Sequence, residues 1–160
     1  MKYTFFYKAR HPFSNWHRSK FVAEDGKEYN CSEQWMMAEK ARIFGDEETR
    51  AKILASTDPK EHKALGREVK NFVPSEWTAI CKDVVYQGLK MKFSQNPSMK
   101  QVLLDTAGTQ IVEAAADDRI WGIGLGEDDP LIHDPKNWQG TNWLGEILTQ
   151  LREDFISGKA

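Results

Sequence analysis

The stretch CSEQWMMAEKARIFG, residues 31–45, predicts the helix on which the rest of the fold depends. Ser32 is a favoured N-cap residue, and Gly45 is favoured just beyond the end of a helix, where the backbone turns left-handed. Between them the apolar residues recur at helical spacing, which is typical of a helix that packs one face against a core. We therefore expect a helix of about three turns, with both ends marked by the sequence.

Two charged side chains fall on a face of this helix that is otherwise apolar. Positions seven residues apart return to nearly the same side of a helix, so Glu33 and Lys40 share one stripe with Met37. Glu33 lies in the first turn, where the helix dipole favours an anion. The two charges stand roughly 10 Å apart along the axis, so long side chains could converge on a group between them. They could equally be separate charges that extend to solvent.

The segments on either side predict an α+β fold that is mostly helical. Further helices are predicted over residues 46–55, 59–69, 74–97, 98–108 and 142–156. Strands are predicted over residues 3–7 and 109–115, and two short strands within residues 21–30 on either side of an Asp25-Gly26 hairpin turn. The strands come early and once more late, so their order does not alternate with helices as a doubly wound sheet requires. A length of 160 residues fits a single compact domain over residues 1–160 with a small β-sheet.

The composition narrows the classes of function. A chain with 40% hydrophobic and 29% charged residues is typical of soluble globular proteins, and its net charge of −2 argues against broad binding to a nucleic-acid backbone. It leaves room for a pocket that binds one nucleotide or one modified base. Cys31 and Cys81 belong to no CxxC or Cys/His cluster, so we expect no metal and a reduced, cytoplasmic protein. No apolar segment has the length of a membrane span or a secretion signal.

The stretch EAAADDRIWGIGLG, which begins at Glu113, is a second dense group of acids and glycines around an aromatic ring. Glu113 closes the predicted buried strand, and Asp118 precedes Trp121 by three residues. Gly122 and Gly124 lack side chains, which would let a ligand approach the backbone beside the tryptophan. The same pattern also suits a tight turn around a tryptophan in the core.

Further candidate ligand-binding residues are spread along the chain. They come from the early loop PFSNW and from two later positions: Ser14, Asn15, Trp16, Arg67 and Asn142. Arg67 could bind a phosphate with two hydrogen bonds or face solvent, and Asn142 could bind a ligand or act only as an N-cap. The four histidines share no metal spacing, so we expect them at the surface or in loops. The basic run LKMKF, residues 89–93, is typical of a solvated helix edge.

Together these residues suit chemistry at the anomeric carbon of a sugar. The chain offers three acids and a lysine but no evident Ser/His or Cys/His pair for nucleophilic catalysis. Cleavage of a C–N glycosidic bond builds positive charge on the sugar, which one carboxylate can stabilise while another activates water. Tryptophan rings could hold the departing base. Such a reaction needs no metal and no cofactor.

These stretches together resemble the NADAR family, also called the YbiA-like family. The resemblance keeps its order along nearly the whole chain: PFSNW at 12–16, SEQWMMAEKA at 32–41, LGR at 65–67, KFSQNP at 92–97, IVEAAADDRIWGIGL at 111–125 and GTNWLG at 140–145. It implies a single NADAR domain with the YbiA-like fold and the activity of an N-glycosidase. Two substrate classes are implied, namely early pyrimidine intermediates of riboflavin synthesis and ADP-ribose attached to guanine bases in DNA.

The resemblance also implies which residues act. The acid of the family's S-E motif falls on Glu33, its lysine on Lys40 and the aspartate before its W-G pair on Asp118, and we expect these three to be catalytic. The family's tryptophans fall on Trp77 and Trp121, which we expect to contact the substrate together with Glu113 and the glycines of the second stretch. The chain departs from the family in a longer acidic loop, EDDPLIHDP, which leaves the choice of substrate open.

The expected partners follow from these substrate classes. They are a small nucleotide-type substrate or ADP-ribosylated guanine in nucleic acid, with a DNA ADP-ribosyltransferase toxin as a functional counterpart and no membrane. Two mechanisms stay open. Either a carboxylate orients water against the anomeric carbon, or Lys40, with its pKa lowered by burial, attacks the sugar and forms a Schiff base.

Two other interpretations compete with an enzyme. A binding module would hold ADP-ribose or a nucleotide without cleaving it, and its acids would bind ribose hydroxyls. A purely structural interpretation would use the tryptophans and the charged pair only to stabilise the fold.

Overall fold

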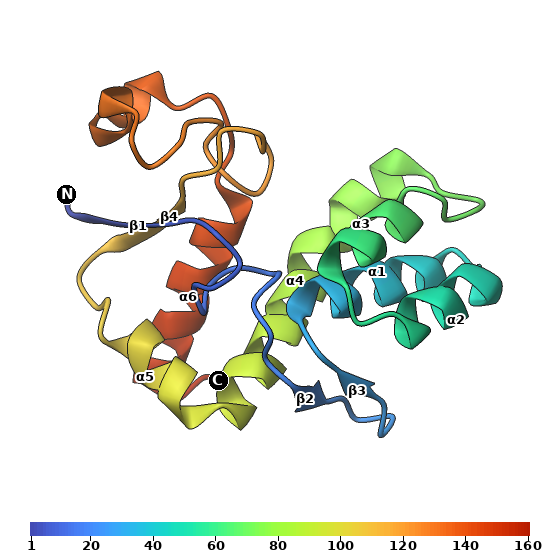
Figure 1. Ribbon diagram of the computed structural model, residues 1–160. Coiled ribbons are helices and arrows are strands. Elements are labelled where there is room, and N and C mark those ends of the chain that lie inside the picture. The colour runs from blue at the N-terminus through green and yellow to red at the C-terminus, as the bar shows by residue number, and fades with distance from the viewer. The chain divides into compact units, whose positions relative to one another are not determined.

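A computed structural model describes residues 1–160 and confirms the α+β class, with helices as the main elements and two small sheets (Figure 1). The chain forms two compact units, one of residues 15–97 and one of residues 1–14 and 98–160. The expectation of a single domain over the whole chain stays a prediction. None of the helices combines the length and the apolar composition that crossing a membrane requires.

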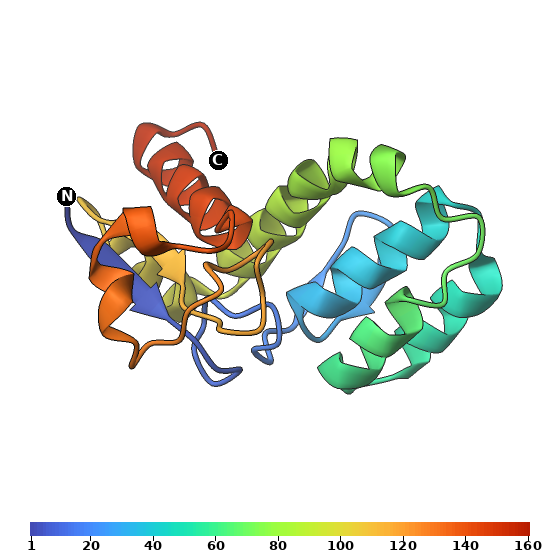
Figure 2. The same ribbon diagram turned by 90° about the horizontal axis from the view of Figure 1, so that it is seen from above.

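Helix α1 lies at the centre of the unit formed by residues 15–97. The elements of this unit are β2 (Phe21–Val22), β3 (Glu28–Tyr29), α1 (Ser32–Ile43), α2 (Glu47–Ala55), α3 (Pro59–Gly66) and α4 (Pro74–Gln95). Helices α2, α3 and α4 all pack against α1, and Figures 1 and 2 show the first three helices side by side. Strands β2 and β3 pair antiparallel, and Tyr29 packs its ring edge-on against Trp35 of α1.

The N-terminus of α1 differs by one residue from the prediction. The helix begins at Ser32 itself, and Cys31 stands in the cap position without a side-chain capping bond. The N–H of Glu33 instead donates to the main-chain carbonyl of Asn15 at 2.9 Å. A distant loop therefore satisfies one of the N–H groups that a helix leaves open at its start. The other end is as predicted, because Gly45 follows the helix with φ of 75°.

Helix α4 buries one continuous face, and this face overturns the prediction for the basic run. Its buried residues recur at helical spacing: Cys81, Val85, Gly88, Leu89, Lys92 and Phe93. Lys92 is 0% exposed, so residues 89–93 are not a solvated edge. The prediction was wrong because charge composition was weighed above the period of the apolar face on which Lys92 lies.

The second unit is built on a parallel pair of strands. Its elements are β1 (Tyr3–Phe6), α5 (Pro97–Leu104), β4 (Gln110–Glu113), two 3-10 helices (Pro130–His133 and Pro135–Asn137) and α6 (Trp143–Ser157). Strand β1 pairs with β4 in a register that places Phe5 opposite Val112. Ile111 and Val112 are fully buried, as predicted, and α6 packs against β4.

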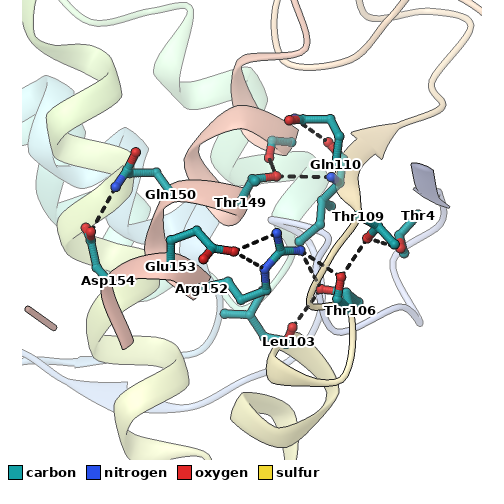
Figure 3. Close-up of polar contacts among 12 residues, drawn as sticks. Thr4, Leu103, Thr106, Thr109, Gln110, Thr149, Gln150, Arg152, Glu153 and Asp154 are labelled. Carbon is teal, nitrogen blue, oxygen red and sulfur yellow. Dashed lines mark hydrogen bonds and ion pairs between the residues drawn. The ribbon is translucent and has the colours of Figure 1, made fainter. Parts of the chain in front are cut away.

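Polar side chains of α6 fix the turn that leads into β4 (Figure 3). Arg152, which is almost completely buried, donates from Nη1 to the carbonyl and the hydroxyl of Thr106 at 2.9 and 3.0 Å. The hydroxyl of Thr149 accepts from the N–H of Ile111 at 3.0 Å. Because a two-stranded sheet leaves many main-chain groups unpaired, these side chains stabilise β4 where no third strand does.

Candidate active site

Glu33, Met37 and Lys40 lie on one helix, α1, as predicted, and the side chain of Glu33 is buried rather than extended to solvent. Glu33 is 5% exposed and Met37 7% exposed, while Lys40 is half-buried. The carboxylate of Glu33 acts electrostatically on Lys40, and so does the guanidinium of Arg67, which follows α3. The structure therefore brings together three of the predicted residues within the unit of residues 15–97. The alternative of two separate solvated charges is wrong for Glu33.

Burial controls the protonation of Lys40. Partial burial lowers the pKa of the Lys40 ammonium, the negative charge of Glu33 opposes this effect, and the positive charge of Arg67 adds to it. The net direction is downward, which raises the fraction of neutral amine at a given pH. A neutral amine is the form that attacks an electrophilic carbon.

The end of the Lys40 side chain lies against one aromatic ring, Phe72, which in turn packs against Phe44. The ammonium nitrogen lies 4.3 Å from the centroid of the Phe72 ring. The ring of Phe44 meets the ring of Phe72 edge-on at 5.3 Å, and the N–H of Phe44 donates to the carbonyl of Lys40. The ammonium of Lys40 therefore lies against the segment that follows α3.

Close packing between α1 and α3 places Arg67. A Cβ atom at Gly66 would overlap the sulfur of Met37, so a larger residue there would require the flexible Met37 side chain to move. Helix α3 was predicted to continue to residue 69 but ends at Gly66. Because Arg67 is the next residue, the short helix delivers its charge to the neighbourhood of Lys40.

The early loop supports the start of α1. The hydroxyl of Ser32 donates to Oδ1 of Asn15 at 2.9 Å, in addition to the main-chain bond between Glu33 and Asn15. Ser14 and Asn15 are buried, and Trp16 is half-buried. The structure therefore brings Asn15 beside Glu33, as a residue that fixes the backbone of the helix start. The predicted contact of these loop residues with a ligand stays a prediction.

A second set of titratable groups lies beside the start of α1. Burial raises the pKa of the Cys31 thiol to about 11, the charge of Glu33 acts in the same direction, and the charge of Lys92 opposes it. Burial lowers the pKa of Lys92 to about 7. His62 is fully buried, with Nε2 2.7 Å from the carbonyl of Ser56, which makes the prediction of a surface position wrong for this histidine. The raised pKa makes Cys31 a poor nucleophile.

In the other unit, Asp118 shapes the turn before Trp121. Its Oδ1 accepts from the N–H groups of Ile120 and Trp121 at 2.9 and 2.8 Å. Its carbonyl accepts from the N–H of Gly124 at 3.0 Å. These bonds define an Asx turn, in which a carboxylate takes the place of a main-chain carbonyl. Oδ1 of Asp118 is therefore engaged with the backbone.

The glycines of this turn are required by the packing of the chain itself. A Cβ at Gly122 would lie 2.9 Å from the carbonyl oxygen of Glu113, and Gly124 has φ of 71°. Trp121 is half-buried, with its ring edge-on to Trp143 at 5.7 Å, so it is not a core tryptophan. A tight turn therefore explains why glycines stand at positions 122 and 124. Because the Trp121 ring is only half-buried, its predicted contact with a substrate stays a prediction.

Asn142 links β4 to the start of α6. Its Oδ1 accepts from the N–H of Glu113 at 3.0 Å, and its Nδ2 donates to the carbonyl of Ile111 at 3.1 Å. The residue occupies the cap position of α6 with φ of 53°, but its side chain makes no capping bond. The prediction that Asn142 acts only as an N-cap is therefore wrong, because its amide hydrogen-bonds to the main chain of β4 and not to the first turn of α6.

Sequence reasoning missed three residues that act on this region: Asp46, Phe72 and Lys92. The apolar period of α4 was the signal that could have revealed Lys92. Phe72 carried no signal, because its contact with Lys40 depends on the path of the chain after α3. Trp77, predicted from the family resemblance, lies half-buried in the first turn of α4.

Comparisons with known proteins agree with this architecture. The sequence model of the NADAR domain matches residues 5–156. An N-glycosidase of Acanthamoeba polyphaga mimivirus is 40% identical and aligns over 96% of both chains, and protein irg-1 of Caenorhabditis elegans is 39% identical over 96% of this chain and 79% of its own length. The NMR structure of the Escherichia coli protein YbiA superposes with a TM-score of 0.80 at 28% identity, covering 99% of this chain and 87% of YbiA.

Proposed function

Because the chain belongs to the NADAR family, we propose that it is an N-glycosidase that hydrolyses the C–N glycosidic bond of a ribosyl nucleotide-type substrate. The observation that carries the proposal is the buried carboxylate of Glu33 acting on the half-buried amine of Lys40, whose pKa is lowered by burial. A residue whose protonation is perturbed by burial and by a specific charged partner is a candidate for chemistry. The name of the mimivirus relative, an N-glycosidase, supports the same class of reaction.

The route that fits Lys40 best is covalent. The neutral amine attacks the anomeric carbon, the C–N bond to the base breaks, and its electron pair goes to the base nitrogen, which gains a proton as the amine loses one. Opening of the ribose ring then converts the C–N bond to Lys40 into an imine, with the ring oxygen taking up the proton from nitrogen. Water adds to the imine carbon and releases the sugar and the free amine. The lowered pKa of Lys40 favours the first step.

The second route uses water directly. A carboxylate orients water against the anomeric carbon while another group protonates the departing nitrogen. Glu33 would be the carboxylate in this route, and Lys40 would stabilise charge rather than form a bond. Trapping with borohydride separates the two routes, because only the imine route gives a stable mass increase on Lys40 during turnover.

Two substrate classes follow from the family and from the names of relatives. The Arabidopsis thaliana riboflavin biosynthesis protein PYRR is 32% identical over 86% of this chain, although the match covers only 19% of that protein. This relative favours early pyrimidine intermediates of riboflavin synthesis. ADP-ribose on guanine bases of DNA is the other class, and it would make the protein the counterpart of a DNA ADP-ribosyltransferase toxin. The positive charge of Arg67 beside Lys40 suits the phosphate that both classes carry.

A paired assay tests the proposal. It measures release of ADP-ribose from ADP-ribosylated guanine in a short DNA strand, and release of ribose 5-phosphate from the pyrimidine intermediates. Turnover of either substrate that disappears in Lys40→Ala and falls in Glu33→Gln is the expected result. Tight binding of ADP-ribose without turnover of either substrate would instead indicate a binding module.

Thermal melts of Glu33→Gln test the structural interpretation. Breaking a buried ion pair by removal of one partner costs on the order of 3–5 kcal/mol. A change of that size with full turnover per folded molecule would mean that Glu33 serves the fold. We expect a small change in melting temperature and a large loss of turnover.

A further inference from the structure

The segment between α3 and α4 carries Phe72, whose ring contacts the ammonium of Lys40. Lys40 Nζ lies 4.3 Å from the ring centroid, well inside the distance at which a ring face attracts a cation. Phe72 is half-buried, and its ring also meets the ring of Phe44 edge-on.

A buried carboxylate anchors this segment. Asp46, 6% exposed, accepts from the N–H of Lys70 at 2.9 Å through Oδ2, and the same oxygen accepts from the hydroxyl of Thr49 at 2.7 Å. Its Oδ1 accepts from the N–H of Thr49 at 3.1 Å. The carboxylate thus caps α2 and at the same time holds the main chain two residues before Phe72.

Asp58 offers an internal comparison. It also caps a helix, with Oδ1 accepting from the N–H of Lys60 at 3.0 Å. Its hydrogen bonds join it to Ser56, Lys60 and His62, not to the segment that carries Phe72. A simple helix cap needs only what Asp58 provides, so the additional bond from Asp46 to Lys70 serves the placement of the segment.

We propose that Phe72 is a positioning residue that holds the ammonium of Lys40 against its ring, and that Asp46 fixes Phe72 in that place. The inference rests on the proposed function of Lys40 for its consequence in turnover, but the contact itself can be tested without any substrate. A ring face stabilises the charged form, so it opposes the effect of burial and of Arg67 and acts in the same direction as Glu33. Phe72 would therefore set how much neutral amine Lys40 presents.

NMR titration of ¹³C,¹⁵N-lysine-labelled protein tests the contact directly. In Phe72→Leu we expect the pKa of Lys40 to fall by about half a unit, because leucine keeps an apolar side chain beside the ammonium but has no ring face to attract it. Phe72→Tyr keeps a ring and should keep the wild-type titration. An unchanged pKa of Lys40 in a folded Phe72→Leu variant would overturn the inference.

The aspartates supply the second comparison. Asp46→Asn replaces one of the two accepting oxygens by an NH2 group, so the side chain can no longer accept from Lys70 through one oxygen and from the N–H of Thr49 through the other. We therefore expect a shift of the Lys40 titration in the same direction as Phe72→Leu, but smaller. Asp58→Asn, the matched cap variant, should leave the titration unchanged. Equal shifts in the two variants, or no shift in either, would contradict the anchoring role of Asp46.

Turnover separates this inference from the proposed function. If both hold, the acid limb of the pH–rate profile of Phe72→Leu moves to lower pH by the shift seen in the titration. If Lys40 titrates as expected but the wild type turns over neither substrate, the positioning stands and the glycosidase proposal fails. If the wild type is active and Phe72→Leu changes neither titration nor profile, the glycosidase proposal stands and the positioning fails.

Discussion

The region around α1 and the turn around Asp118 use their polar side chains in opposite ways. In the α1 region the charges of Glu33 and Arg67 act on the protonation of Lys40. In the turn, Oδ1 of Asp118 and both polar atoms of the Asn142 amide bind main-chain N–H and C=O groups. The first arrangement tunes a chemical group, and the second shapes a backbone. We infer that the reactive group belongs to α1 and that the side chains of the turn fix the backbone around Trp121 and the end of β4.

Loss of the Lys40 amine should have the largest effect. We expect Lys40→Ala to lower turnover by at least about 10³-fold, because a nucleophile or a charge at the reacting carbon is removed. The melting temperature should change little, since the side chain is only half-buried. Steady-state kinetics with both substrates provide the measurement.

Lys52→Ala is the matched control for this experiment. Lys52 lies on α2 with a side chain that is 61% exposed, and it should be replaceable without effect. Similar turnover in the two alanine variants would show that Lys40 is not the reactive group. The reactive group would then have to be sought outside the α1 region.

Asp118 gives the next largest effect and tests the contrast from the other side. Asp118→Asn keeps an oxygen that can accept from Ile120 and Trp121, so the turn should persist while the charge is lost. If Asp118 is the predicted second acid, turnover falls about 10²-fold with an unchanged melting temperature. Asp118→Ala should lower both, because the turn also loses its acceptor. Full activity of Asp118→Asn would leave Asp118 with a role in shape alone.

The sequence was sufficient to predict that each helix exists and which residues form the α1 stripe, although α3 and α5 end at Gly66 and Leu104, before the predicted ends at residues 69 and 108. Helical spacing, Gly45 and the proline at the start of α4 are local signals, and they located α1 and α4 to within about two residues. The coupling of Glu33 with Lys40 was predictable because both lie on one helix. The predicted catalytic role of Asp118 came from the resemblance to the NADAR family, because no local sequence pattern defines that role.

The remaining features depend on contacts between segments far apart in the chain. Asn15 satisfies the start of α1, and Asp46 holds Lys70, through bonds that span 18 and 24 residues. No periodicity encodes such pairings, because they follow from how helices pack. Lys92 was misplaced for a different reason, since its helical position indicated burial but its charge argued against it.

Lys92 should give a pH dependence of stability that its replacement removes. Burial lowers its pKa to about 7 in the folded state, from an ordinary value of 10.5 in the unfolded chain. Between these two pKa values the unfolded state binds more protons than the folded state, so the free energy of unfolding rises with pH from 7 to 10.5. Below pH 7 the folded protein carries the full energetic cost of the buried charge. Between pH 7 and pH 9 the stability of wild type relative to Lys92→Met should rise by about 2–3 kcal/mol.

Urea unfolding at several pH values measures this difference. Lys90→Met on the same helix is the control and should follow the wild type. A constant difference between wild type and Lys92→Met across the window would mean that Lys92 remains charged in the folded protein. That result would remove Lys92 as a neutral amine in the α1 region but would not change the electrostatic coupling of Glu33 and Arg67 with Lys40.

Asn142 should give the smallest effect and the sharpest test of the turn as a shaping element. Asn142→Ala removes two side-chain hydrogen bonds to β4 and places alanine at φ of 53°, where it is strained, so we expect a loss of about 2 kcal/mol in the free energy of unfolding. Asn137→Ala, whose amide makes one exposed bond, is the control. If the amide only shapes the strand end, KM and turnover per folded molecule stay near their wild-type values. A raised KM with unchanged stability would instead mean that Asn142 contacts the substrate, and the turn would then share in binding as well as in shape.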